Sequence, residues 1–508
     1  MTSTIAIGSV ASPRLPRGVH SSSRFAFVAL GVLATGIALI GAGTPSYWGD
    51  EAASVTSALR PLPSLFAELA HVDAVHGLYY LFLHVWVGLV GTSEFAVRAP
   101  SAVAMGFAVA GTGVLGSRLL GRRVGIIAAL VLTVLPEMTR MAIEARSYAF
   151  AVAAGVWLTI FLVHLVSREA SRRWWVLFGV CAALCVYLFL YLLLLVVVHA
   201  VVVLAMRASR QTGRRWLSAL AIAGVLALPV IVVAVLQGGQ IEFLAHRHYA
   251  TFDSVAVRQW FLTPWMAAIA WLLIAGCVVL TVLHRRILSA SRVRGAIIAL
   301  VWVAAPTALL LIGNAWLHPM YNMRYPAFCL PGVALAMAVG IDELARFARH
   351  GRARRVVAGL LLIAVAATAA PSFIAERGQY AKDGGSDLRQ LAEQVHARAH
   401  AGDAIVFDAT TRNSRRPRLA LDLWPKSFAG LDDVELITPY VDRAWLWDEV
   451  APLDQVTAAV STHQTVWAVE SHAGASSDLD VLARLGYRVV DIVHVHRTSI
   501  YELSREIT

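Results

Sequence analysis

The sequence predicts an α-helical polytopic membrane protein that carries a smaller soluble α/β domain after its last span. Of its 508 residues, 58% are hydrophobic and only 15% are charged, and the mean hydropathy is +0.66, outside the usual range of soluble proteins. Apolar runs recur along the first three quarters of the chain, and the composition turns polar after residue 376. The formal net charge of +11 resides in arginine clusters between apolar runs, which membrane topology explains without nucleic-acid binding.

The apolar runs predict about eleven transmembrane helices. The first run follows Arg14, Arg17 and Arg24, which favours an uncleaved helix behind a cytoplasmic N-terminal segment (1–24) over a signal peptide. One long run, 174–206, has room for two short helices. The runs cover 25–43, 99–116, 124–139, 148–166, 174–206, 216–236, 264–283, 295–312, 326–341 and 356–370.

Arginine placement predicts which loops face the cytoplasm. The basic loops at 118–123, 168–173, 207–215, 284–294 and 346–355 alternate with weakly basic ones. The basic loops are therefore expected inside the cell and the others outside. A further apolar segment, 77–90, would break this alternation if it crossed the membrane. We therefore interpret it as a re-entrant or interfacial element within a first external loop that spans residues 44–98.

The polar segment 377–508 predicts an external α/β domain behind a membrane domain of residues 25–376. Strand-like runs at 404–407, 466–469 and 488–494 are interleaved with helical patterns at 387–399 and 477–485. All four cysteines lie in or beside apolar segments of the membrane domain, where helix packing is favoured over a redox role. The spacing of possible ligands predicts no metal site, although a need for a divalent metal is not excluded.

Two adjacent carboxylates, Asp50 and Glu51, are the strongest local signal for chemistry. They follow Tyr47 and Trp48 directly after the first predicted span. A half-buried carboxylate at a membrane surface can be tuned to accept a proton from a hydroxyl group. The alternative is structural, because acidic residues in the first turn of an interfacial helix stabilise its N-terminus.

Three further clusters lie in predicted external loops, and each has a structural alternative. Asp73 and the run His76 to Tyr80 precede the apolar segment 77–90, where His76 could be an interface residue. Glu144 and Arg146 could hold a phosphate or simply form an ion pair. Arg324 could bind a lipid phosphate or anchor the chain at the interface. It lies in a loop that also contains His318, Tyr321 and Tyr325.

The distribution of charges argues against two classes of transporter. The predicted spans are almost free of Asp, Glu, Lys and Arg, whereas acids and arginines gather in the loops of one face. Ion-coupled transporters usually keep ionisable groups at the middle of the membrane. No Walker A pattern occurs, which disfavours an ATP-driven pump.

Taken in order, these motifs resemble the GT-C superfamily of membrane glycosyltransferases. The chain is most similar to the glycosyltransferase family 39 branch of protein O-mannosyltransferases and to the aminoarabinose transferases that modify lipid A. The resemblance covers residues 25–370 and implies the GT-C fold. It departs from the pattern of relatives that have a Pro-Pro pair after the histidine, because Gly77 and Leu78 follow His76 here. The motifs are Trp48 to Glu51, Asp73 with His76 to Tyr80, Val97 to Ser101, Glu144 to Tyr148, and Arg324 with Tyr325.

The resemblance also implies residue roles. Asp50 would be the catalytic base, with Glu51 in support. Arg146 and Arg324 would bind the phosphate of the donor lipid. Substrate positioning would fall to the remaining loop residues, which are Asp73, His76, Tyr79, Glu144, His318, Tyr321 and Tyr325.

The expected function is an inverting transfer of a sugar from a polyprenyl-phosphate donor on the external face of the cell membrane. Mannose is the sugar favoured, an arabinose-type pentose is possible, and no cofactor is expected. The acceptor would be a cell-envelope glycan, a glycolipid or a protein. One alternative is a transporter or flippase of lipid-linked sugars, which should tolerate Asp50→Asn. Another is an envelope scaffold that acts through its external domain.

Overall fold

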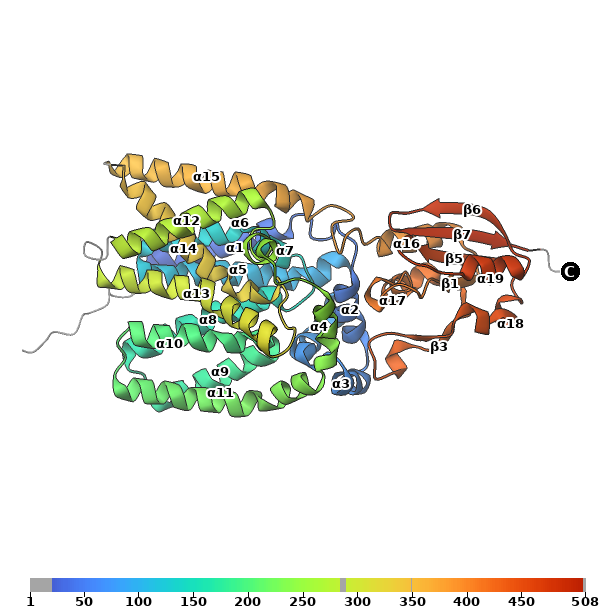
Figure 1. The fold of residues 1–508 in the computed structure, drawn as a ribbon, viewed down its shortest axis with the longest axis horizontal. Helices are drawn as coiled ribbons and strands as arrows, with labels where there is room; N and C mark the ends of the chain where they lie inside the picture. The colour runs from blue at the N-terminus through green and yellow to red at the C-terminus, as the bar shows by residue number, and fades with distance from the viewer. Residues whose placement is uncertain (1–20, 284–288, 349, 506–508) are drawn as a thin grey trace, which may run out of the picture.

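The computed structural model describes residues 21–283, 289–348 and 350–505. A bundle of long helices forms one part of the molecule and a sheet-containing domain the other (Figure 1). We call the end of the bundle that meets this domain the domain end, and the opposite end the far end. Of the predicted cytoplasmic segment 1–24, residues 1–20 lie outside the described residues.

A helix coincides with each apolar run predicted from the sequence. Among the described residues, six helical segments are long and apolar enough to cross a membrane: 94–120, 148–168, 210–236, 290–316, 325–346 and 351–375. This confirms a membrane protein, while the total of eleven spans and their sidedness stay predictions. The helices are α1 (Ser21–Leu39), α5 (Glu94–Leu120), α6 (Arg122–Val134), α8 (Tyr148–Arg168), α9 (Arg172–Leu188), α10 (Leu195–Ala205), α11 (Arg210–Leu236), α12 (Pro264–Leu283), α13 (Ala290–Trp316), α14 (Leu330–Arg346) and α15 (Gly351–Ala375).

Two predicted runs are interrupted for identifiable reasons. The run 124–139 ends its first helix at Val134, because Pro136 starts a separate short helix, α7 (Pro136–Met141). The run 174–206 divides, as expected, into α9 and α10 around a 3₁₀ turn, η2 (Leu190–Leu194). Both interruptions lie at the domain end, where they release loops toward the candidate site.

Helix α14 forms the centre of the bundle. Nearly all of its residues are buried, and it contacts α6, α12, α13 and α15. Small residues allow the neighbouring helices to approach closely, as is common in membrane proteins. A Cβ atom added to Gly31 of α1 would lie 2.7 Å from the carbonyl oxygen of Gly106 in α5. The rigid bundle therefore fixes the ends of the helices that carry the candidate site.

The predicted first external loop folds into short helices at the domain end: α2 (Gly49–Leu59), α3 (Leu62–His71), η1 (Ala74–His76) and α4 (Gly77–Val90). Helix α4 packs against α2. With 14 residues it is about 21 Å long, short of the roughly 30 Å of a bilayer core. This length supports the interpretation of 77–90 as an interfacial or re-entrant element, which stays a prediction.

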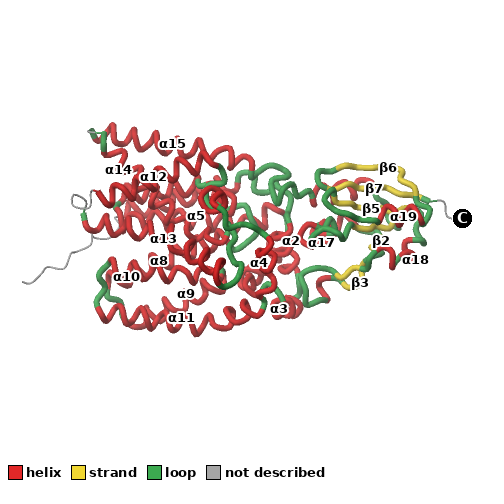
Figure 2. Tube along the Cα trace, in the orientation of Figure 1, coloured by secondary structure: helices red, strands yellow, loops and turns green. Residues whose placement is uncertain are grey.

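The C-terminal domain, where the strands of the molecule gather (Figure 2), is built on a five-stranded mixed sheet. The strand order is β2-β1-β5-β7-β6, with β1 parallel to both of its neighbours and β7 antiparallel to both of its own. The predicted strands 404–407 and 488–494 are β1 and β6, and 466–469 lies within β5. The described elements are α16 (Leu388–Arg398), β1 (Ala404–Phe407), η6 (Asn413–Arg415), α17 (Leu419–Leu423), η7 (Pro425–Phe428), β2 (Asp432–Asp433), β3 (Leu436–Thr438), η8 (Tyr440–Asp442), β4 (Glu449–Val450), η9 (Leu453–Gln455), α18 (Thr457–Val460), β5 (Thr465–Ser471), α19 (Asp478–Arg484), β6 (Arg488–His494) and β7 (Thr498–Ser504).

Polar contacts hold this domain on the domain end of the bundle. Arg60, at the end of α2, donates from Nη1 to the carbonyl oxygen of Arg443 at 2.8 Å. Arg389 of α16 donates from Nη1 to Glu94 Oε1 at 3.0 Å and to the carbonyl oxygen of Gly43 at 2.9 Å. The segment η6 also contacts α2. The domain thus lies directly over the first loop and its acidic residues.

Candidate active site

Asp50 is presented by the first turn of α2. Trp48 precedes this helix in extended conformation, so the chain turns sharply where the carboxylates begin. The Asp50 side chain is 36% exposed, and its Oδ2 atom lies 3.3 Å from Nη1 of Arg324. Asp50 therefore has access to solvent and a cation beside it.

Arg324 connects two carboxylates that are distant in sequence. Its Nη1 atom lies 3.5 Å from Oε1 of Glu144, in addition to its contact with Asp50. Its guanidinium lies over the Trp48 ring, 4.4 Å from the ring centroid. This stacking orients the guanidinium and leaves donors free for an anion.

Arg146 lies on the other side of Asp50 and is held by a chain of polar contacts. Its Nη1 donates to the Asp50 carbonyl oxygen at 3.3 Å and to the Tyr80 hydroxyl at 3.2 Å. Its Nη2 lies 2.9 Å from Nε2 of His76. The Tyr80 hydroxyl in turn donates to Asp73 Oδ2 at 2.7 Å. His76 and Asp73 therefore position Arg146.

The charges around this cluster shift its carboxyl groups in opposite directions. Burial raises the pKa of Asp50, against the lowering effect of Arg146 and Arg324. Burial also acts to raise the pKa of Glu144, but Arg324, Lys382 and other cations outweigh it and lower that pKa. One carboxyl is thus tuned toward proton uptake while the other stays ionised, a division of labour typical of catalytic sites.

His76 is tuned to remain neutral. Burial lowers its pKa to about 3, and the nearby Arg146 lowers it as well. A neutral ring can accept the hydrogen bond of Arg146 through Nε2. His76 is therefore an acceptor that orients a guanidinium, with no proton to supply near neutral pH.

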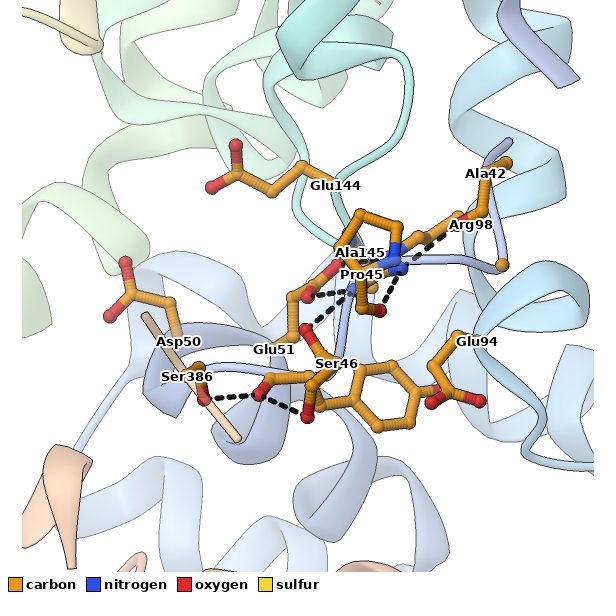
Figure 3. A network of polar contacts seen from close by, with 12 residues as sticks. Ala42, Pro45, Ser46, Asp50, Glu51, Glu94, Arg98, Glu144, Ala145 and Ser386 are labelled. Atoms are coloured by element: carbon orange, nitrogen blue, oxygen red, sulfur yellow. Dashed lines mark hydrogen bonds and ion pairs between the residues drawn. The ribbon is translucent and has the colours of Figure 1, made fainter. Parts of the chain in front are cut away.

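Glu51 is separated from Asp50 although the two are adjacent in sequence (Figure 3). Its buried carboxylate accepts from Nε of Arg98 at 2.8 Å and from Nη2 at 2.6 Å, and the backbone N–H of Ala145 donates to it at 2.9 Å. Arg98 also donates to the carbonyl oxygen of Pro45. The Glu51 carboxylate thus joins α2, α5 and the Glu144 loop into one scaffold, and the catalytic support expected of it stays a prediction.

Of the remaining predicted residues, Tyr325 and Tyr79 lie near the cluster, whereas Tyr321 and His318 have no described contact with it. Tyr325 stacks on Tyr191 with centroids 4.7 Å apart, one residue beyond Arg324, and Tyr79 is buried in α4. Tyr321 donates from its hydroxyl to Gln259 Oε1 at 2.7 Å, and His318 is exposed, its Nδ1 lying 3.0 Å from the Pro319 carbonyl oxygen. Among the described contacts, none joins Tyr321 or His318 to Asp50 or to the two arginines.

Sequence reasoning missed two members of the site. Tyr80 belonged to a recognised motif, yet only the fold reveals its contact with Arg146. Lys382 lies in the segment that joins α15 to the C-terminal domain, and it is buried on the Glu144 side of the cluster. The sequence offered one sign of Lys382, which is that lysine is rare in this chain: Lys382 and Lys426 are the only lysines.

A metal site is not evident in the described ranges. Within residues 21–283, 289–348 and 350–505, no three His, Cys, Asp or Glu side chains lie in an arrangement that could hold a metal ion. The polar atoms beside Asp50 belong instead to arginines, which suit an anion.

A family model matches part of the membrane domain. Residues 78–236 match the sequence family described as dolichyl-phosphate-mannose-protein mannosyltransferase, a stretch that contains Tyr80, Glu144 and Arg146. A search of curated proteins gave no match.

Solved structures extend the likeness to nearly the whole chain. ArnT from Cupriavidus metallidurans in the apo state superposes with a TM-score of 0.58 and 13% identity over 95% of this chain and 98% of that one. The same protein bound to undecaprenyl phosphate gives 0.58 and 14% identity over the same shares. The arabinofuranosyltransferase AftD from Mycobacteria gives 0.54 and 16% identity over 97% of this chain and 41% of that one.

Proposed function

This chain is a membrane protein with the fold of the GT-C glycosyltransferases, and we propose that it is an inverting glycosyltransferase that takes its sugar from a polyprenyl-phosphate donor. In this proposal Asp50 is the base, and Arg146 and Arg324 bind the donor phosphate. The site faces the external side of the membrane.

One observation supports the proposal above the others: a partly exposed carboxylate is paired with one arginine, and a second arginine is bound to the backbone of the same residue. Asp50 is in contact with Arg324 through its side chain and with Arg146 through its carbonyl oxygen. A transfer from a lipid phosphate needs a base and cationic donors within one sugar's reach of each other. Burial raises the pKa of Asp50, which suits its role as the base.

The reaction follows from these positions. The acceptor hydroxyl oxygen attacks the anomeric carbon as its proton passes to Asp50. The bond between the anomeric carbon and the phosphate oxygen breaks, and its electron pair stays on the phosphate. Arg146 and Arg324 stabilise the negative charge that develops there. Glu144 keeps Arg324 between the two carboxylates, and a single displacement of this kind inverts the anomeric centre.

For the donor sugar we propose mannose first and an arabinose-type pentose second. The family matched by residues 78–236 is described as acting with dolichyl-phosphate-mannose, and AftD is described as an arabinofuranosyltransferase. The crystal structure of ArnT with undecaprenyl phosphate supports a polyprenyl carrier. The acceptor we propose is a cell-envelope glycan, glycolipid or protein.

The test compares membranes that contain the wild type, Asp50→Asn or Asp253→Asn at matched expression. Radiolabelled polyprenyl-phosphate mannose is the donor, with the corresponding arabinose lipid in parallel. Asp253 is the matched control, since it is half exposed and pairs with Arg258 away from the site. We expect transfer by the wild type and the control, and a loss of roughly 100- to 10,000-fold for Asp50→Asn.

The alternatives predict other results. A transporter or flippase of lipid-linked sugars would move the donor across vesicle membranes and keep that activity in Asp50→Asn. A scaffold would tolerate Asp50→Asn and lose its function when residues 377–508 are deleted. Undiminished transfer by Asp50→Asn would contradict the role proposed for this residue.

A further inference from the structure

The segment between α15 and α16 brings a lysine to the site from the side of the C-terminal domain. This segment is fixed to the loop just before Asp50: the Ser46 backbone N–H donates to the Gln379 carbonyl oxygen at 3.2 Å, and the Ser386 hydroxyl donates to the Tyr47 carbonyl oxygen at 2.6 Å (Figure 3). Lys382 lies between these two attachments. These two hydrogen bonds therefore hold the backbone of Lys382 close to Asp50, the proposed base.

The ammonium group of Lys382 is buried without a hydrogen-bond partner in the described part of the chain. The residue is 5% exposed, and no described atom accepts a bond from Nζ. Burial lowers its pKa, and Glu144 is the carboxylate that opposes this most, followed by Glu51. A buried cation that lacks a hydrogen-bond acceptor is costly to maintain, which suggests that an acceptor arrives with a ligand.

The nearby carboxylates are already engaged by other donors. Glu51 is bound by Arg98 and by the Ala145 N–H. Glu144 lies 3.5 Å from Arg324 and is one charge among four cations, Arg324, Lys382, Arg140 and Arg146, of which Arg140 is paired with Glu137 at 2.8 Å. Once the Arg140–Glu137 pair is set aside, the remaining three cations share the two carboxylates of Glu144 and Asp50. The surplus of positive charge suits a phosphate group.

We propose that Lys382 is a third cation of the donor site and that its Nζ donates to a phosphate oxygen of the polyprenyl-phosphate sugar. The inference rests on the proposed function. The phosphate diester carries one negative charge, and a second develops on it when the bond to the anomeric carbon breaks. The acceptor proton passes to Asp50, so Lys382 keeps its own protons and stabilises the leaving phosphate. The C-terminal domain thereby completes the site through its connecting segment.

The first experiment uses the rarity of lysine. Purified protein with a lysine-free tag is treated with an amine-reactive reagent, with or without undecaprenyl phosphate, and modification is followed by mass spectrometry. At a lipid concentration ten times its Kd, we expect modification of Lys382 to slow roughly tenfold. The exposed Lys426 is the internal control and should react equally in both samples. Equal modification of Lys382 with and without the lipid would overturn the proposal.

A second experiment tests the proposal even if Lys382 reacts too slowly to follow. Binding of undecaprenyl phosphate is measured for the wild type, Lys382→Met, Lys382→Arg and Lys426→Met. We expect Lys382→Met to weaken binding roughly tenfold or more, Lys382→Arg to restore most of it, and Lys426→Met to bind as the wild type does. The donor KM should follow the same order, with the acceptor KM unchanged.

The outcomes separate this inference from the proposed function. If Lys382 only balances the charge of Glu144, Lys382→Met will lower the thermal unfolding midpoint and leave the Kd for the lipid unchanged, which would overturn the inference. If the wild type itself does not bind undecaprenyl phosphate, the polyprenyl-phosphate donor is refuted, and the inference with it.

Discussion

The two ends of the helix bundle each hold a cluster of acids and arginines, and the clusters differ in how well their charges are satisfied. At the far end, Asp342 and Glu343 of α14 are both buried. Asp342 Oδ1 lies 2.9 Å from Nε of Arg123 and 2.9 Å from Nη2 of Arg354, and its Oδ2 pairs with Arg292. These short bonds join the ends of α6, α13, α14 and α15.

At the domain end Glu51 is paired as closely, with Arg98 at 2.6 Å, but the two carboxylates that face Arg324 make longer contacts. The carboxylates of Asp50 and Glu144 lie 3.3 and 3.5 Å from Arg324. Arg146 is held mainly by neutral groups of Tyr80 and His76, and Lys382 Nζ has no hydrogen-bond partner in the described ranges. At the far end both carboxylate oxygens of Asp342 are paired with arginines, whereas at the domain end the whole ammonium group of Lys382 lacks an acceptor among the described residues. Under the proposed function, the end of the bundle whose cations are incompletely paired is the end that binds the donor.

The largest expected effect comes from breaking the far-end cluster. Asp342→Ala leaves Arg123, Arg292 and Arg354 without their shared buried partner, which should cost about 3–5 kcal/mol of stability. The thermal unfolding midpoint in detergent should therefore fall, while the transfer rate per folded molecule should match the wild type. A normal midpoint combined with a lost transfer rate would reverse the roles assigned to the two ends.

The second largest effect is expected from a change at the domain end, where Arg324 contacts two carboxylates. Arg324→Gln removes the guanidinium that faces Asp50 and Glu144, so the charge that develops on the phosphate loses one donor. The rate of transfer should fall roughly 100- to 1,000-fold, with a thermal midpoint close to that of the wild type. Arg352→Gln at the start of α15, which is exposed, is the matched control. A large fall in the midpoint of Arg324→Gln would indicate a structural pair instead.

The smallest effect concerns the support of Arg146. His76→Asn weakens the acceptor that orients Arg146, and we expect the donor KM to rise roughly tenfold with little change in folding. His318→Asn is the control, because His318 is exposed and has no described contact with the cluster. Since the pKa of His76 is lowered to about 3, the donor KM should show no histidine titration between about pH 5 and 8. An unchanged donor KM in His76→Asn would refute this role.

Much of the fold could be predicted from the sequence because apolar length and residue periodicity are local signals. The sheet was harder to predict at β7, whose Thr498–Ser504 segment mixes polar and apolar residues and is defined by pairing with β5 and β6. Strand pairing of this kind depends on contacts that are distant in sequence. The break at Pro136 was readable in principle from the residue itself.

The candidate site could be predicted only in part. The motifs contained Asp50, Arg146 and Arg324, but adjacency suggested that Asp50 and Glu51 act together. A helix turns successive side chains about 100° apart, so one carboxylate entered the cluster and the other met Arg98. Lys382 required the docking of a segment more than 200 residues from Glu144, which no local pattern reveals.

The most direct test of the central claim is the pH dependence of kcat/KM for transfer by the wild type. The base must be deprotonated to accept the acceptor proton, so activity should fall as the pH drops through the pKa of Asp50. Because burial raises that pKa above its ordinary value of 3.8, we predict a single acid limb with its midpoint above 3.8 and a tenfold fall per pH unit below it. A rate that stays level down to the pH at which the protein unfolds would contradict the assignment of Asp50 as the base.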